Sequence, residues 1–253
     1  MSNDALKTRL YINAPLASGS DVMLPLGQTH YLLNVLRLSK SAKIAVFNGV
    51  DGEFEAEIST ISRKQSALTI GQMRRPHQQC RDLWLMFAPV KKARLDFIAQ
   101  KASELGVRVI WPVNTEFCQV SRVKNDRMIA NAIEAAEQTE RLDIAEVRPF
   151  TGLDEALATC EDDRLLIWCD ETCARQQAHN IMAALLDAPA HSKAAILIGP
   201  EGGFSKRERN YLSQQKNCLK VSLGPRILRS DTAAISALSC YQSICGDWQD
   251  NLS

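Results

Sequence analysis

The stretch Ile196-Leu-Ile-Gly-Pro-Glu-Gly-Gly-Phe-Ser205 is an apolar run that ends in a Gly-Pro turn. A second stretch of the same design, Val221-Ser-Leu-Gly-Pro-Arg-Ile-Leu-Arg-Ser-Asp-Thr232, follows further along the chain. In each, the pattern of a buried strand leads into a turn and then into the start of a helix. Two parallel strands would therefore bring two glycine-rich loops to the same edge of one sheet, which is where α/β proteins bind ligands.

The first loop, residues 199–203, contains three glycines and a proline. Glycine lacks a Cβ, so the backbone can adopt positive φ and lie directly against a ligand, and we expect Gly202 to tolerate no β-branched side chain. Glycine is also common in ordinary turns, and it is the repetition of the design that favours a ligand loop. Ser205 and Glu208 predict a capping box at the start of the next helix. A P-loop and a Rossmann fingerprint are both excluded, because neither GK[ST] nor an early GxGxxG is present.

The second loop carries two arginines three residues apart, Arg226 and Arg229, just before a helix expected to start near Ser230 or Asp231. Both arginines could be solvated turn residues, the commoner fate of a surface arginine. A Gly-Pro turn would instead hold Arg226 rigidly at the ligand edge, where a guanidinium can bind a phosphate or a nucleobase carbonyl with fixed geometry. The arrangement favours a functional role for Arg226.

The two loops resemble the cofactor-binding half of the RsmE family of ribosomal RNA methyltransferases, which belongs to the SPOUT superfamily of trefoil-knotted enzymes. The resemblance extends over nearly the whole chain. The other matching segments are Arg9-Leu-Tyr-Ile12, His30-Tyr-Leu-Leu-Asn-Val-Leu-Arg-Leu38, Phe47-Asn-Gly49, Glu104-Leu-Gly-Val-Arg-Val-Ile110 and Glu134-Ala-Ala-Glu-Gln138. The sequence departs from the family in the turn Ser39-Lys-Ser-Ala42, which replaces Gly-Asp, in Asp231, which replaces Glu, and in Ile144-Ala-Glu146, which lacks a proline.

The resemblance implies a cytoplasmic homodimer that uses S-adenosylmethionine (SAM) to methylate N3 of a uridine in 16S rRNA, at uridine 1498 of the 30S subunit. SAM needs an apolar slot and backbone hydrogen bonds for its adenine. The residues that we expect to line this slot are Leu197, Gly199, Pro200, Glu201, Gly202, Leu223, Gly224, Ile227 and Leu228. A direct methyl transfer requires no metal, and none is expected.

Uridine N3 must lose a proton before it can attack, and the resulting negative charge spreads onto O2 and O4. A fixed guanidinium beside either oxygen would stabilise that anion as an oxyanion-hole donor does. Arg226 is the first candidate for this role, and Arg9, placed by the N-terminal domain or by a partner subunit, is the second. Asp231 or Glu201 could accept the proton, although Asp231 could equally cap the last helix.

Two other functions remain open at this stage. One is a SPOUT methyltransferase that acts on a ribose 2′-hydroxyl or on another base, and the other is a non-catalytic RNA-binding protein with a vestigial pocket. The intact pair of glycine loops argues against the second. The segment Glu134–Arg141 is either a solvated helix end with a Glu137–Arg141 pair or a surface that faces RNA or the cofactor. His30 and Arg37 are either packing and surface residues or contacts to phosphate.

The composition limits the number of domains and the class of protein. The chain has 253 residues, 45% of them hydrophobic, and a net charge of +1, which allows one large domain or two of ordinary size. No apolar run is long enough to span a bilayer and no leader opens the chain, so we expect a soluble, unexported protein. The eight cysteines show no CxxC pair and the four histidines are scattered, which indicates free thiols and no metal site.

The chain changes its pattern near residue 75. Residues 1–75 predict a PUA-like or OB-like barrel that binds RNA, with one helix at Thr29–Leu38, and residues 74–79 form a linker. The strands expected there are Arg9–Ile12, Asp21–Leu24, Lys43–Phe47, Glu53–Ile61 and Ser66–Ile70.

Residues 80–253 alternate between strands and helices, which predicts a parallel sheet covered on both faces. This part corresponds to the SPOUT domain of the resemblance. The strands expected in this part are Leu83–Phe87, Val107–Trp111, Leu165–Cys169, Ala194–Ile198 and Leu219–Leu223, and the helices are Lys92–Leu105, Asn125–Glu140, Ala174–Leu186, Lys206–Gln215 and a final helix.

Overall fold

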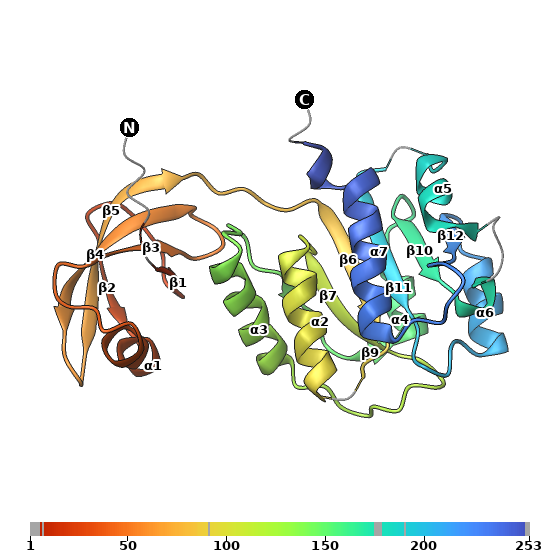
Figure 1. Cartoon of the computed structure of the whole chain (residues 1–253), viewed down its shortest axis with the longest axis horizontal. Helices are drawn as coiled ribbons and strands as arrows, with labels where there is room; N and C mark the ends of the chain where they lie inside the picture. Colours follow the sequence, from red (N-terminus) through yellow and green to blue (C-terminus); the bar gives the residue numbers. More distant parts are fainter. Residues whose placement is uncertain (1–5, 7, 91, 175–178, 190, 251–253) are drawn as a thin grey trace. The chain divides into compact units, whose positions relative to one another are not determined.

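A computed structural model describes residues 6, 8–90, 92–174, 179–189 and 191–250 (Figure 1). The chain forms two compact units. The first unit comprises residues 1–79 together with 136–144, and the second comprises residues 80–135 and 145–253. Among the described residues, no helix is both long enough and apolar enough to cross a membrane.

The first unit is built on a five-stranded sheet in the order β1-β3-β4-β5-β2. The β1 and β3 strands are parallel and the other neighbours are antiparallel. The strands are β1 (Arg9–Tyr11), β2 (Asp21–Leu24), β3 (Lys43–Phe47), β4 (Glu53–Ile61) and β5 (Ser66–Arg75). All five were expected, but β5 continues to Arg75 and so includes the start of the segment expected to be a linker. Apolar side chains from these strands form one core with Leu32.

The expected helix at Thr29–Leu38 begins and ends earlier than the sequence indicated. It consists of α1 (Leu26–His30) and a π-helical turn, η1 (Tyr31–Val35). Arg37 has a φ of 53°, a left-handed conformation that cannot continue a helix. Ser41, in the turn that departs from the family pattern, also has a positive φ of 67°.

The second unit contains a parallel sheet in the order β12-β10-β11-β6-β7-β8. Its strands are β6 (Asp82–Phe87), β7 (Val109–Asn114), β8 (Glu146–Val147), β10 (Leu165–Cys169), β11 (Lys193–Ile198) and β12 (Cys218–Val221), and β9 (Thr151–Gly152) pairs with β7. The two strands that carry the glycine loops, β11 and β12, both pair with β10. The prediction that parallel strands bring both loops to one edge of a sheet is therefore confirmed.

Helices cover both faces of this sheet, as expected (Figure 1). One core packs against α2 (Lys92–Glu104), α3 (Asn125–Gln138), α5 (Ile181–Leu186) and α7 (Ser230–Ile244), and the other packs against α4 (Leu153–Ala158) and α6 (Lys206–Ser213). The short elements β8, β9 and α4 were not predicted. The expected helix Ala174–Leu186 is shorter, because a 3₁₀ turn, η2 (Glu171–Cys173), follows β10, and α5 begins only after its N-cap, Asn180. Residues 175–178 of that expectation lie outside the described part.

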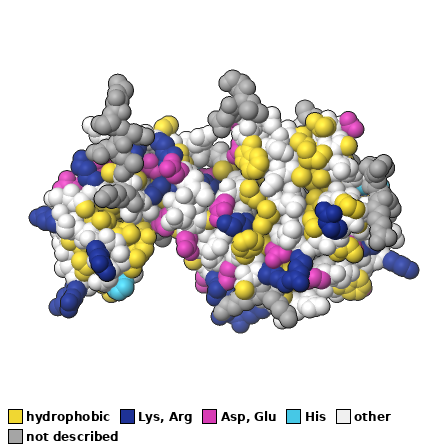
Figure 2. Space-filling view, in the orientation of Figure 1, with side chains coloured by type: hydrophobic (Ala, Val, Ile, Leu, Met, Phe, Trp, Pro, Cys, Tyr) yellow, Lys and Arg dark blue, Asp and Glu magenta, His cyan; other side chains and the backbone are white. Residues whose placement is uncertain are grey.

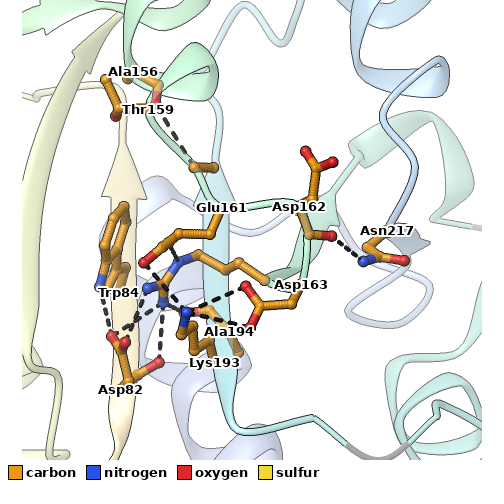
Figure 3. Close-up of polar contacts among 12 residues, drawn as sticks. Asp82, Trp84, Ala156, Thr159, Glu161, Asp162, Asp163, Lys193, Ala194 and Asn217 are labelled. Atoms are coloured by element: carbon orange, nitrogen blue, oxygen red, sulfur yellow. Dashed lines mark hydrogen bonds and ion pairs between the residues drawn. The ribbon is translucent and has the colours of Figure 1, made fainter.

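The amino ends of three strands are joined by the buried side chain of Arg164. Its guanidinium donates to Asp82 at the start of β6 at 3.0 Å, to Glu161 at 2.9 Å, and to the carbonyl of Ala194 on β11 at 3.2 Å. Figure 3 labels these three partners, and Arg164 is drawn there without a label. It also lies 3.6 Å from the centre of the Trp84 ring. This edge of the sheet is occupied by structural contacts, and the carboxyl edge carries the glycine loops.

Candidate functional site

A cavity lies at the carboxyl ends of β10, β11 and β12, with about 570 Å³ of empty space including its opening to solvent. The lining residues come from the three strand ends, the two glycine loops and the start of α7. They are Cys169, Asp170, Glu171, Ala174, Ile198, Gly199, Pro200, Glu201, Val221, Ser222, Leu223, Gly224, Arg226, Ile227, Leu228, Ser230 and Ala233.

The first loop folds back on itself, with the Gly203 N–H donating to the Pro200 carbonyl at 2.9 Å. Gly203 has a φ of 68°, whereas Gly199 and Gly202 do not lie in the left-handed region. A Cβ on Gly199 would lie 2.7 Å from the Phe204 ring, so a side chain has no space there. The positive φ expected in this loop is therefore found at Gly203 and not at Gly202.

The second loop depends on Gly224, whose φ of 105° is accessible to few other residues. Its N–H donates to the Ser222 hydroxyl at 3.2 Å. Ser230, the first residue of α7, donates its hydroxyl to the carbonyl of Gly199 at 3.1 Å. This hydrogen bond joins the two loops, so the walls of the cavity are held together by buried contacts.

Arg226 lines the cavity on an exposed part of the second loop. Within the described part of the chain, its guanidinium makes neither a hydrogen bond nor an ion pair, so its donors are available to a bound molecule. Arg229 is also exposed but is not among the lining residues. The cavity lining thus includes Arg226, the arginine that the sequence favoured, and does not include Arg229.

Two carboxylates at the end of β10 belong to the cavity and were missed by the sequence analysis. Asp170 is buried and pairs with Lys220 at 3.0 Å and with Arg209 at 3.4 Å. Burial alone would raise the pKa of Asp170, but hydrogen bonds from the Thr172 N–H and from Lys220 outweigh it and lower the pKa. Glu171 pairs with Arg209 at 2.6 Å. Their position directly after an apolar strand was a signal that could have identified them.

Most of the residues expected to bind the cofactor line this cavity, and two do not. Leu197 belongs to the core on the opposite face of the sheet. Neighbouring side chains of a strand point to opposite faces, so Ile198 lines the cavity instead. Gly202 lies against Phe117, whose Cβ would be 3.1 Å from a Cβ at position 202. A cofactor role for these two residues has no support from the lining of the cavity.

Arg9 lies within the first unit, and its guanidinium is already occupied. It donates to Glu53 at 2.6 Å, to the carbonyl of Arg141 at 2.5 Å and to the carbonyl of Ala136, and it stacks 3.6 Å from the centre of the Phe47 ring. These contacts are those of a structural residue.

The segment Glu134–Arg141 is solvated only in part, because Glu134 and residues 138–140 are exposed whereas Ala136 and Arg141 are buried. Glu137 accepts a hydrogen bond from the Tyr11 N–H at 2.8 Å. Arg141 is buried and pairs with Asp143 at 2.7 Å. The end of α3 and the residues after it are therefore packed into the first unit.

The candidate proton acceptors both lie near Arg94. Oε1 of Glu201 lies 3.5 Å from Nη1 of Arg94, and Oδ2 of Asp231 lies 3.7 Å from Nε of the same arginine. Asp231 is the second residue of α7 and does not occupy the N-cap position, which is Arg229.

The capping box predicted for Ser205 and Glu208 is confirmed at the start of α6. No cluster of metal-binding side chains occurs among the described residues.

Comparison with known proteins agrees with this geometry. A family model described as an RNA methyltransferase domain matches residues 77–242, and one described as an RNA methyltransferase PUA domain matches residues 27–71. The chain is 33% identical to Ribosomal RNA small subunit methyltransferase E of Rickettsia conorii, over 91% of this chain and 93% of that protein. The chain belongs to the RsmE family. The expected fold class, a SPOUT methyltransferase domain with a PUA-like N-terminal domain, is confirmed, while the trefoil knot stays a prediction.

Two solved structures are also similar to this chain. One is Ribosomal RNA small subunit methyltransferase E from Neisseria gonorrhoeae bound to S-adenosyl methionine, with a TM-score of 0.83, 29% identity and coverage of 95% of this chain and 99% of that one. The other is a putative methyltransferase from Legionella pneumophila in complex with SAM, with a TM-score of 0.81, 31% identity and coverage of 95% and 98%.

Proposed function

We propose that this chain is a SAM-dependent methyltransferase that modifies N3 of a uridine in 16S rRNA of the small ribosomal subunit. The observation that carries the proposal is the cavity between the two glycine loops, with the unpaired guanidinium of Arg226 in its wall. The names of the relatives support the rRNA substrate, and the two SAM-bound structures support the cofactor.

The residues of the cavity suit SAM. Ile198, Val221 and Leu228 provide apolar walls for an adenine, and the loop backbone at Gly199 and Gly224 is bare of side chains. Bound SAM supplies an activated methyl group. These residues would hold it in place, and alignment with the nucleophile is the main contribution that an enzyme makes to a direct displacement.

Arg226 stabilises the uracil anion in this proposal. Deprotonated uridine N3 shares its charge with O2 and O4, and a guanidinium beside one of them is worth about 3 kcal/mol, as an oxyanion-hole donor is. Arg9 becomes the weaker candidate, because its donors are taken by Glu53 and by two carbonyls. Glu201, which is partly exposed and lines the cavity, is the proposed proton acceptor.

The domain assignment is part of the proposal. Residues 1–75 form a PUA-like RNA-binding domain and residues 80–253 form the SPOUT catalytic domain of a cytoplasmic homodimer. The sequence of α7 offers Ile235, Leu238, Tyr241 and Ile244 as a dimer contact. Leu238 and Tyr241 are buried in the core of their own unit, so we place the contact on the partly exposed Ile235 and Ile244. Sedimentation of the purified protein at micromolar concentration tests the dimer, and a single 28.1 kDa species would overturn it.

Mass-spectrometric mapping of methylated nucleosides in 16S rRNA tests the reaction. Cells without this protein should lack one N3-methyluridine, and the purified protein with SAM should restore it on their 30S subunits. Loss of a 2′-O-methyl group or of another base modification would support a different SPOUT specificity.

SAM at about a hundred times its dissociation constant should add roughly 2.7 kcal/mol to the free energy of unfolding. No change in the free energy of unfolding would indicate a protein that only binds RNA.

A further inference from the structure

A second cavity opens on the same edge of the sheet, with about 970 Å³ of empty space including its opening to solvent. It lies between the loop after β7 and the first residues of α4 and α6. Its lining residues are Asn114, Thr115, Glu116, Cys118, Gln119, Val120, Ser121, Gly152, Leu153, Asp154, Arg207 and Glu208. The proposed function gives this cavity no task.

The second cavity adjoins the first through the loop 199–203. Glu201 lines the first cavity, and the next residue, Gly202, packs against Phe117. Phe117 belongs to the loop after β7, whose neighbouring residue Glu116 lines the second cavity and donates its N–H to Glu208 at 2.8 Å. The two cavities are therefore linked through the contact between Gly202 and Phe117.

Uncharged polar groups in the second cavity lack partners. The side chains of Asn114, Gln119 and Ser121 are exposed and make no hydrogen bond with any described residue. The hydroxyl of Thr115 also has no partner, although Thr115 is only 4% exposed. Buried polar groups in folded proteins are almost always hydrogen-bonded, so an unpaired one indicates a missing ligand or water.

Phe117 is 46% exposed and lies in the chain between Glu116 and Cys118, which both line the second cavity. An exposed aromatic ring beside amide and hydroxyl side chains is a typical site for an unstacked base, which stacks on the ring and is hydrogen-bonded along its edge. The amide groups of Asn114 and Gln119 can each donate and accept, as a base edge requires.

The charges favour a base over a phosphate. Arg207 is already paired with Asp154 at 2.7 Å, and Glu116 adds a carboxylate to the wall. In Figure 2 some basic side chains of the second unit lie beside acidic ones, and the whole chain has a net charge of only +1. A site without a positive surplus binds a polar, uncharged group better than an anion.

We propose that the second cavity binds the base of an unpaired nucleotide that flanks the target in the substrate RNA. This base stacks on Phe117, and Asn114 and Gln119 read its edge. The inference rests on the proposed function for the position of the target, but the binding of a single-stranded RNA base stands independently of the reaction. Phe117 is then a positioning residue, because it orients the RNA and does not touch the reacting atoms.

Fluorescence anisotropy with a labelled, mixed-sequence single-stranded RNA tests the stacking contact. Phe117→Ala should weaken binding about tenfold, equivalent to about 1.4 kcal/mol, because it removes the ring on which the base stacks. Phe117→Tyr keeps the ring and should bind within twofold of the wild type. The matched control is Phe97→Ala, which removes a ring that is 40% exposed on α2 and should leave binding unchanged. Equal binding by the wild type and Phe117→Ala would overturn the proposal.

Kinetics on unmethylated 30S subunits separate this role from a structural one. Phe117→Ala should raise KM for the subunit, with unchanged SAM affinity and an unchanged thermal midpoint. Asn114→Ala with Gln119→Ala should flatten the preference among RNA oligonucleotides that differ at a single flanking base. A loss of SAM affinity in Phe117→Ala that Phe117→Tyr does not rescue would show that the ring only supports the loop 199–203. Failure of the proposed methylation would leave the anisotropy result standing, so the two outcomes are distinguishable.

Discussion

The carboxylate of Glu171 lies directly against the backbone of Gly203, so that a Cβ built on Gly203 would be 2.0 Å from Oε1 of Glu171. The same carboxylate oxygen accepts a hydrogen bond from Arg209 of α6 at 2.6 Å. The end of β10, the first glycine loop and α6 are therefore packed at one point. Any side chain at position 203 must displace this ion pair from the wall of the cavity.

Gly203→Ala should reduce SAM affinity at least tenfold. Alanine at a φ of 68° costs about 1–2 kcal/mol, and its methyl group also displaces Glu171. Isothermal calorimetry measures the affinity, and urea unfolding measures the stability. Gly27→Ala is the control, because that residue lies in α1 with free space around it, and it should leave SAM affinity unchanged. Wild-type SAM affinity in Gly203→Ala would remove this loop from the cofactor site.

Arg226→Lys should lower the methylation rate about a hundredfold, with little change in SAM affinity. Lysine keeps the charge but cannot present a rigid, planar pair of donors to a uracil carbonyl, and a loss of about 3 kcal/mol of transition-state stabilisation has this effect. Single-turnover assays on unmethylated 30S subunits at saturating SAM measure it. Arg229 does not line the cavity, so Arg229→Lys should leave the methylation rate nearly unchanged. A wild-type rate for Arg226→Lys would show that Arg226 is not the electrostatic catalyst and would leave Arg9 as the remaining candidate.

Glu53→Gln should destabilise the first unit by about 3 kcal/mol at pH 7, because it leaves the charges of Arg9 and Arg75 without their shared carboxylate. Burial raises the pKa of Glu53, but hydrogen bonds from Arg75 and Arg9 outweigh burial and hold the pKa below its ordinary value of 4.5. The ionised group therefore stabilises the fold above pH 4.5, and this contribution is lost as the pH falls through the lowered pKa.

Urea unfolding of the two proteins from pH 7 down to pH 3 checks both parts of this prediction. The difference between the wild type and Glu53→Gln should be constant above the ordinary pKa of glutamate and should shrink below it. Glu55→Gln on the same strand is the control, since its pair with Lys43 is exposed and worth less than about 1 kcal/mol. A difference that is independent of pH would contradict the assigned shift.

Ser41→Gly should stabilise the protein by about 0.5–1 kcal/mol. Ser41 has a φ of 67° in the turn where the family more often has Gly-Asp, and glycine removes the steric cost of that conformation at some cost in unfolded-chain entropy. Ser39→Gly in the same turn lacks the positive φ and should destabilise by a similar amount. Urea unfolding compares the two variants, and destabilisation by both would show that Ser41 is not strained.

The sequence alone determined much of this architecture, because the decisive signals are local. The alternation of apolar strands and helices after residue 80 required a parallel sheet, and the repeated Gly-Pro turns placed two loops at one edge of it. The capping box at Ser205 and Glu208 and the position of Arg226 after its turn were also readable, because each depends on residues near one another in the chain.

Tertiary structure decided which side chains face the cavity. The run Ala194–Ile198 is apolar throughout, so its pattern does not say whether Leu197 or Ile198 faces the loops, and only the packing of helices on both faces settles it. Tertiary structure also decided which charged side chains are paired. Asp170 finds its partners in Arg209 and Lys220, and Arg9 finds Glu53 and two distant carbonyls. A charged side chain is reactive or structural according to what surrounds it, and those surroundings come from parts of the chain that only folding brings together.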